Sequence, residues 1–165
     1  MLGVILKYKN FYNDIQILFS NLERCLICKM NNISNLKIKD FYFTHEVNTR
    51  FRDIDAFRHV NNAVYLSYFE DARRSFFKSW QINLEDKSLI VASVKIDYVK
   101  QITHPSNCII GQRVSRLGNT SFDILSILFC NDKQASISNT TIVCYDFLKS
   151  KSVPLYQEII NDYNK

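Results

Sequence analysis

Residues 49–73 read TRFRDIDAFRHVNNAVYLSYFEDAR, and the pattern of apolar side chains changes within this stretch. Residues 43–51, which lead into it, alternate apolar and polar side chains, as is typical of a half-buried β-strand. From about Asn62 onward, apolar side chains recur every three or four residues, which predicts a long, deeply packed amphipathic helix. Asn61 or Asn62 is expected to cap that helix, because a short side-chain oxygen accepts from a free N–H in the first turn.

The chain beyond this helix predicts four more strands and a short terminal helix at residues 155–163. The strands are expected at residues 90–99, 108–117, 121–130 and 134–147, with turns at residues 118–119 and 131–133. Consecutive hairpins form an antiparallel sheet, and one long apolar helix must bury its face on such a sheet. We therefore expect an α+β fold in which an antiparallel sheet of about five strands wraps around one long central helix.

Residues 1–40 are interpreted as an N-terminal extension, and residues 41–165 as the folded domain. Within the extension, residues 10–29 carry apolar side chains at helical spacing. That helix is open to three interpretations, namely docking on the domain, lying on a membrane surface, or acting as a weak organellar targeting segment. Translation that starts at Met30 is a further alternative, so the role of the extension stays unknown.

Composition narrows the class of protein. The formal net charge is +5, and residues 1–40 hold six Lys/Arg against three Asp/Glu, so the domain itself is nearly balanced. No basic stripe with interleaved aromatic side chains occurs, so the sequence predicts no nucleic-acid partner. No run of 18 apolar residues occurs, so no transmembrane segment is expected. The five irregularly spaced cysteines favour reduced thiols and a cytoplasmic location.

Three side chains with reactive groups, Asp53, Asp55 and His59, fall between the first strand and the long helix. Loops held between rigid elements commonly carry reactive groups, and the following helix start offers free N–H groups that can stabilise an oxyanion. A carboxylate and an imidazole at such a helix start predict a hydrolytic site. A metal site is the weaker interpretation of the same residues, because the sequence has no second cluster of ligands. We therefore predict no metal site.

The stretch from Thr49 to Arg73 resembles the signature of hotdog-fold thioesterases, whose pattern runs Asp-x-Asp-x-x-x-His-Val-Asn-Asn-x-x-Tyr. It is most similar to the acyl-CoA branch of the 4-hydroxybenzoyl-CoA thioesterase superfamily, with a long-chain acyl-CoA thioesterase-like core. The similarity continues through residues 94–98, 116–122 and 153–155, and it covers roughly residues 43–160. One departure is Arg58, where many relatives carry Gly directly before the His.

The resemblance implies a role for each matching residue. Asp55 takes the position of the catalytic carboxylate, either as nucleophile or as the group that activates water. His59 would position Asp55, the water or the thioester oxygen, although a purely structural role is the alternative. The substrate-contacting positions would be Val60, Asn61, Asn62, Arg58 and Tyr65, with backbone N–H groups of residues 60–62 as oxyanion candidates. Capping is the favoured role of the Asn61 and Asn62 side chains, and Asp53 is interpreted as a surface or loop carboxylate.

The implied reaction is hydrolysis of an acyl-CoA thioester to a carboxylic acid and CoA, with no metal or other cofactor required. Two alternatives stay open: a thioesterase that acts on acyl carrier protein, and a non-catalytic protein that binds acyl-CoA on the same fold. Relatives of this kind are homodimers or homotetramers with active sites at the subunit interface, so the resemblance implies a homo-oligomer.

Overall fold

The computed structural model describes residues 33–82 and 88–165. The chain divides into two units, with the boundary between Leu36 and Lys37, and the fold below belongs to the second unit. The helix expected at residues 10–29 lies outside the described residues. The division into an extension of residues 1–40 and a domain of residues 41–165 stays a prediction.

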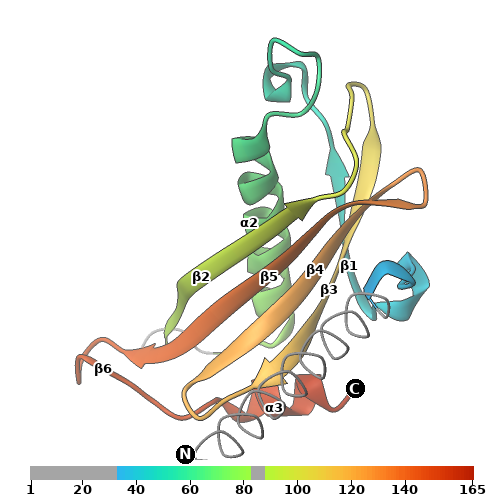
Figure 1. Ribbon diagram of the computed structural model, residues 1–165. Helices are drawn as coiled ribbons and strands as arrows, with labels where there is room; N and C mark the ends of the chain where they lie inside the picture. Colours follow the sequence, from blue (N-terminus) through green and yellow to red (C-terminus); the bar gives the residue numbers. More distant parts are fainter. Residues whose placement is uncertain (1–32, 83–87) are drawn as a thin grey trace, which may run out of the picture. The chain divides into compact units, whose positions relative to one another are not determined.

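The second unit is built on one antiparallel sheet in the order β1-β3-β4-β5-β2, with the short β6 paired to β5 (Figure 1). Its strands are β1 Phe43–Asn48, β2 Ser88–Tyr98, β3 Asn107–Leu117, β4 Ser121–Cys130, β5 Lys133–Asp146 and β6 Lys151–Ser152. The five predicted strands are confirmed, and β6 is an addition. The first strand is shorter than predicted, because residues 51–53 turn into a short 3-10 helix, η2 Phe51–Asp53.

Both predicted hairpin turns are confirmed. Between β3 and β4, the backbone N–H of Gly118 donates to the carbonyl oxygen of Ser121 at 2.7 Å. Between β4 and β5, Asn131 and Asp132 both have positive φ, at 51° and 59°. Two consecutive residues of positive φ match the right-handed twist of paired strands, and Asn and Asp tolerate this conformation better than most residues.

The long helix α2, Asn62–Ser79, crosses one face of the sheet and buries the predicted apolar stripe (Figure 1). Its N-cap is Asn61, whose Oδ1 accepts a hydrogen bond from the backbone N–H of Ala63 at 2.9 Å. Tyr68 packs with one core cluster that reaches β1, β3 and β4, and Phe76 packs with a second cluster farther along the sheet. The predicted central helix and its Asn cap are therefore confirmed.

The remaining two elements are a terminal helix, which packs in the second core cluster, and a short 3-10 helix before β1. The terminal helix α3, Gln157–Tyr163, begins two residues later than predicted and buries Ile159 beside Trp80 and Phe122. Trp80 also donates its indole N–H to Oδ1 of the buried Asp162 at 2.9 Å. A short 3-10 helix, η1 Ile38–Asp40, precedes β1. The whole arrangement is the α+β hotdog architecture that the sequence predicted.

Candidate active site

A buried carboxylate fixes the loop that leads to the site. Oδ2 of Asp53 accepts from the hydroxyl of Tyr68 at 2.6 Å, and from the backbone N–H and Nε of Arg50 at 2.8 Å and 3.3 Å. Asp53 was expected to be a surface or loop carboxylate, and the surface location is wrong, since only 3% of it is exposed. Tyr68 projects from the buried face of α2, so Asp53 ties η2 to that helix.

Burial and hydrogen bonding act on this carboxylate in opposite directions. Burial favours the neutral form of Asp53, but the hydrogen bonds from Tyr68 and Arg50 outweigh it and hold the pKa of Asp53 below its ordinary value. The same contact acts on the phenol in the other direction. Burial and the Asp53 charge raise the pKa of Tyr68, so this hydroxyl remains a hydrogen-bond donor at neutral pH.

The loop then forms a tight turn around Asp55. The backbone N–H of Asp55 donates to the carbonyl oxygen of His59 at 2.9 Å, and the N–H of Arg58 donates to the Asp55 carbonyl at 3.0 Å. Oδ1 of Asp55 accepts from the N–H groups of Phe57 at 2.8 Å and His59 at 3.3 Å. Among the described residues none donates to Oδ2, so the turn holds one carboxylate oxygen and leaves the other without a hydrogen-bond donor.

The turn closes through a residue in a left-handed conformation. Arg58 has a φ of 63°, a region where a side chain costs free energy and glycine does not. This explains in physical terms why glycine suits the position directly before the His. The Arg58 side chain is exposed.

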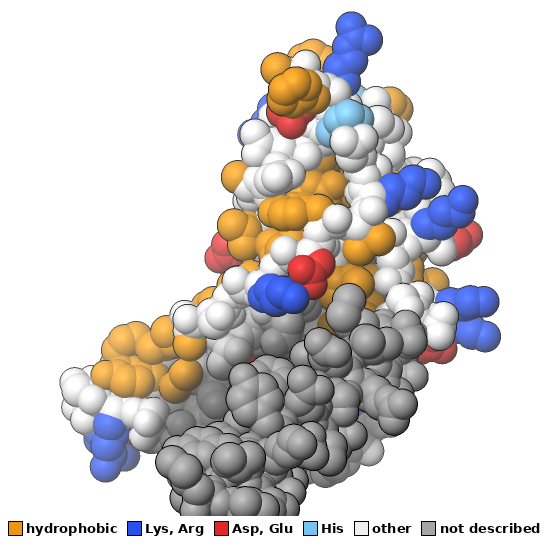
Figure 2. All heavy atoms as spheres, in the orientation of Figure 1, with side chains coloured by type: hydrophobic (Ala, Val, Ile, Leu, Met, Phe, Trp, Pro, Cys, Tyr) orange, Lys and Arg blue, Asp and Glu red, His pale blue; other side chains and the backbone are white. Residues whose placement is uncertain are grey.

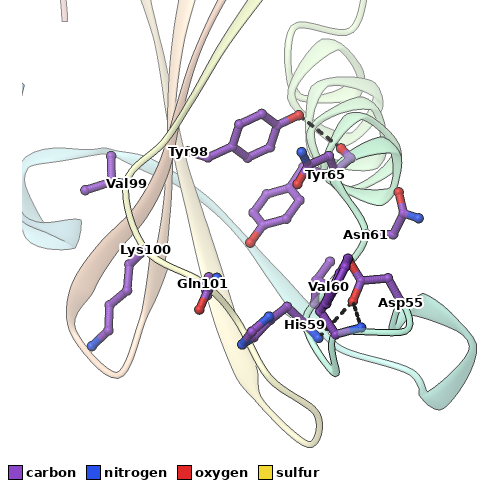
Figure 3. Close-up of a pocket in the computed structure, with 11 residues that line it drawn as sticks. Asp55, His59, Val60, Asn61, Tyr65, Tyr98, Val99, Lys100 and Gln101 are labelled. Atoms are coloured by element: carbon purple, nitrogen blue, oxygen red, sulfur yellow. Dashed lines mark hydrogen bonds between the residues drawn. The ribbon is translucent and has the colours of Figure 1, made fainter.

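A pocket of about 720 Å³ lies between this loop, the start of α2 and the end of β2, and we call it the site pocket (Figure 3). It is lined by Asp55, Phe57, His59, Val60, Asn61, Asn62, Tyr65, Tyr98, Val99, Lys100 and Gln101. The structure therefore brings together six of the seven predicted site residues. Arg58 is the one that does not line the pocket.

The second wall of the pocket was not predicted as part of the site. Tyr98 donates its hydroxyl to the backbone carbonyl of Asn62 at 3.1 Å, and its ring stands edge-on to that of Tyr65, with the ring centroids 5.1 Å apart. These contacts join the end of β2 to the first turn of α2. A signal for Tyr98 was present, because it ends one of the segments, residues 94–98, that carry the family resemblance. Lys100 and Gln101 had no such signal.

The imidazole of His59 and the carboxylate of Asp55 do not contact one another. Figure 3 shows the His59 ring directed away from the Asp55 carboxylate, and the hydrogen bond that this carboxylate accepts from His59 comes from the backbone N–H. The histidine thus holds the turn with its main chain and presents its ring separately to the pocket.

Only one of the three predicted oxyanion donors is available. The N–H of Val60 donates to the carbonyl oxygen of Ile102 at 2.8 Å, and the N–H of Asn61 donates to that of Asp53 at 2.9 Å. No described residue accepts from the N–H of Asn62, which is the first residue of α2. An N–H at this position is normally without a partner inside its own helix and carries the positive end of the helix dipole.

The described residues contain no group of three or more metal-ligating side chains that could hold an ion. In the same part of the chain, no helix combines the length and the apolar character that crossing a bilayer requires.

Several known proteins are similar to this chain in sequence or in structure. A curated protein of Bacillus subtilis, YsmA, is 34% identical over 86 residues, and the match covers 51% of this chain but only 58% of YsmA. Among solved structures, a thioesterase from Thermus thermophilus complexed with coenzyme A and Zn is 28% identical, with a TM-score of 0.67 over 76% of this chain and 99% of that one. The PA2801 protein of Pseudomonas aeruginosa is 25% identical, with a TM-score of 0.68 over 73% and 97% of the two chains.

The family model of the thioesterase-like superfamily matches residues 49–161, which include the site loop, α2 and the entire sheet after β1. Membership of the long-chain branch stays a prediction. With a hotdog architecture, a carboxylate in the loop before the central helix and a family match over residues 49–161, this chain belongs to the thioesterase-like superfamily.

Proposed function

We propose that the protein hydrolyses an acyl-CoA thioester in the site pocket, releasing a carboxylic acid and CoA. The observation that carries this proposal is that Asp55 and Asn62 line the same pocket, and that no described residue accepts from the Asn62 N–H at the start of α2. Hydrolysis of a thioester needs an attacking or activating oxygen on one side of the carbonyl and a donor for the developing oxyanion on the other. The family match supports the reaction class, and the coenzyme A in the Thermus thermophilus structure supports the CoA thioester.

Each residue has a proposed task. Oδ2 of Asp55 attacks the thioester carbonyl, or takes a proton from the water that does, while Oδ1 is held by the turn. The Asn62 N–H stabilises the oxyanion, and the C–S bond breaks with release of the CoA thiolate, which takes a proton from water. In the nucleophilic route, a water then hydrolyses the anhydride formed on Asp55, which frees the acid and restores the carboxylate. His59 is a candidate for orienting the water or the thioester, and Tyr65 with Tyr98 forms the aromatic wall against which the acyl group packs.

The substrate of this reaction is tested by measuring free thiol released from a panel of acyl-CoA esters of short, long and aromatic acyl groups. We expect release of one thiol for each acid formed. Binding of acyl-CoA without thiol release would instead favour the alternative of a non-catalytic protein that binds acyl-CoA. Trapping an acyl adduct on the peptide that contains Asp55 would separate the nucleophilic route from activation of water.

A carrier-protein thioester is a second candidate because of the surface around the site loop. Phe51 and Phe57 are 85% and 81% exposed, and Arg52 and Arg58 are exposed between and beside them. Figure 2 shows this end of the molecule, at the top of the view, with hydrophobic side chains next to a basic one. Such a surface suits an acidic protein partner. Comparing kcat/KM on the same acyl group carried by CoA and by acyl carrier protein decides between the two.

A homo-oligomer is the proposed assembly. β2 forms one edge of the sheet, and its last residue, Tyr98, lines the site pocket. The backbone N–H and C=O groups along a sheet edge pair readily with another strand. A second copy paired along β2 would extend the sheet and cover the pocket mouth at the same time.

A further inference from the structure

Two cysteines lie directly opposite each other on neighbouring strands. Cys108 of β3 is the register partner of Cys130 of β4 in the antiparallel ladder. Both are free thiols, and the Sγ of Cys108 is in hydrogen-bond contact with the Sγ of Cys130, 2.6 Å away. The side chains therefore lie on the same side of the sheet and meet.

The backbone at this pair already satisfies what a covalent link requires. Directly opposite residues of an antiparallel pair have Cα atoms about 4.5 or 5.5 Å apart, depending on their hydrogen bonding. Disulfides join cysteines whose Cα atoms are about 4.4–6.8 Å apart. Both values for an opposed pair fall inside this range, so the spacing of the paired strands is compatible with a link between Cys108 and Cys130.

The two thiols differ in access. Cys108 is 2% exposed and packs in the core cluster, whereas Cys130 is only partly buried. Burial and the neighbouring thiol raise the pKa of Cys108, which keeps it protonated. A reagent from solution therefore meets Cys130 first, and Cys108 is placed to react second.

We propose that Cys108 and Cys130 form a dithiol modification site that small-molecule disulfides oxidise reversibly to a cross-strand disulfide. The thiolate of Cys130 attacks the reagent disulfide, RSSR, forming a mixed disulfide and releasing one RSH. Cys108 then loses its proton and attacks the Cys130 sulfur, which releases the second RSH and leaves the two cysteines bonded. The protein loses two electrons and two protons, and the reagent gains them.

The cysteine pair is connected to the site pocket through the core. Cys108 belongs to the same core cluster as Tyr65 and Tyr68, and Tyr65 lines the site pocket. The link would join β3 to β4 within the core cluster that also contains Tyr65. The inference itself does not rest on thioester hydrolysis, because formation of the bond is read by mass and not by activity.

The test uses the full chain carrying Cys25→Ser and Cys28→Ser, which leaves Cys108, Cys130 and Cys144 as its three cysteines. The protein is equilibrated with oxidised glutathione, its free thiols are alkylated, and it is digested with trypsin. We expect peptide 101–113 joined to peptide 117–133, the number of free thiols falling from three to one, and full recovery of the thiols with dithiothreitol.

The controls separate pairing from general thiol reactivity. Cys144→Ser, which removes a buried thiol from β5, should leave the linked peptides unchanged. Cys130→Ser should leave Cys108 reduced, because its thiol is buried. Glutathione attached to Cys130 with no link to Cys108, or oxidation that spares both, would overturn the proposal. The linked peptides are measured in a chain that keeps both Cys108 and Cys130. A control variant that fails to fold therefore does not affect this measurement.

Discussion

The backbone N–H of His59 donates to Oδ1 of Asp55 at 3.3 Å, while the two side chains make no hydrogen bond to each other. The carboxylate is therefore oriented by the peptide backbone of its own turn, with Phe57 supplying the second N–H at 2.8 Å. Because backbone donors orient Asp55, its geometry does not depend on the protonation state of the imidazole. Changes at His59 and changes at Asp55 should thus have separable effects.

Replacing Asp55 with Asn is expected to leave the turn intact and remove the reaction. The Asn oxygen can still accept from the N–H groups of Phe57 and His59, but an amide is neither a nucleophile nor a base. We expect kcat to fall by about 100-fold to 10,000-fold, as for loss of a general acid–base group. Thiol release measures the rate, and a denaturation midpoint close to that of wild type confirms the fold. Turnover near the wild-type rate would contradict the proposed role.

The buried Asp53 predicts a pH dependence of stability. Its pKa is lower in the folded protein than in the unfolded chain, where the ordinary value is 3.8. Its ionised form therefore stabilises the fold fully above that value, and this contribution is lost as the pH falls through the lower folded pKa. Stability should decline as the pH is lowered from about 4, the region of the unfolded pKa of Asp.

Tyr68→Phe tests the cause of that dependence. The variant keeps the packed ring but removes the hydroxyl that donates to Asp53 at 2.6 Å. Loss of a hydrogen bond to a buried charge should lower the free energy of unfolding by about 1.5–3 kcal/mol at neutral pH. The difference from wild type should shrink as the pH falls from about 4 through the lower folded pKa of Asp53, because protonation removes the charge that the hydroxyl stabilises. Tyr163→Phe, which changes an exposed tyrosine, serves as the control.

The periodicity of side chains was enough to predict the fold. Strand alternation and helical spacing report burial on one face, and they located α2 and the five long strands. The two-residue β6 is too short to show any period. The end of β1 was set too late, because Phe51 continues the alternation in sequence while its backbone has already entered η2.

The site was predicted less completely, because contacts across the fold leave little trace in local pattern. Asp53 is buried against Tyr68, which lies fifteen residues later in the chain. The one local hint was that Tyr68 belongs to the apolar face of the long helix, where a buried hydroxyl group needs a hydrogen-bond partner. The engagement of the Val60 and Asn61 N–H groups depends on loop geometry, which residue types do not report. Lys100 and Gln101 reach the site pocket only because β2 ends beside α2.

Arg58→Gly tests whether the Arg58 side chain contributes to substrate binding, although its left-handed backbone conformation would favour glycine. Removing a side chain from a left-handed residue should raise the free energy of unfolding by about 1 kcal/mol. If the guanidinium attracts an anionic substrate, KM for acyl-CoA should rise while kcat is little changed. Gln81→Gly is the matched control, since Gln81 has a φ of 54° after the end of α2 and does not line the site pocket. An unchanged KM in both variants would remove Arg58 from the substrate-binding residues.

A lysine placed on the edge strand β2 should prevent the proposed pairing of two copies of the chain. Val91 is 40% exposed on this strand, and lysine on an edge strand is a common means of preventing edge pairing. Val91→Lys should lower the molar mass measured by light scattering toward that of one chain, with the secondary structure retained. Leu148→Lys, in the exposed connection between β5 and β6, should leave the mass unchanged. Equal masses for Val91→Lys and wild type would exclude pairing along β2.

The oxyanion donor can be removed by a single substitution that the helix tolerates. Asn62 is the first residue of α2, where proline is well accepted because its missing N–H has no partner within the helix. The preceding Asn61 has φ −59° and ψ 137°, a conformation compatible with a following proline. Asn62→Pro should therefore keep the fold and lower kcat by about 100-fold to 1,000-fold, as for loss of one oxyanion donor. Asn62→Ala removes the side chain but keeps the N–H, so it should retain most of the activity. If both variants lose activity equally, the side chain of Asn62 and not its backbone N–H is the group that acts on the substrate.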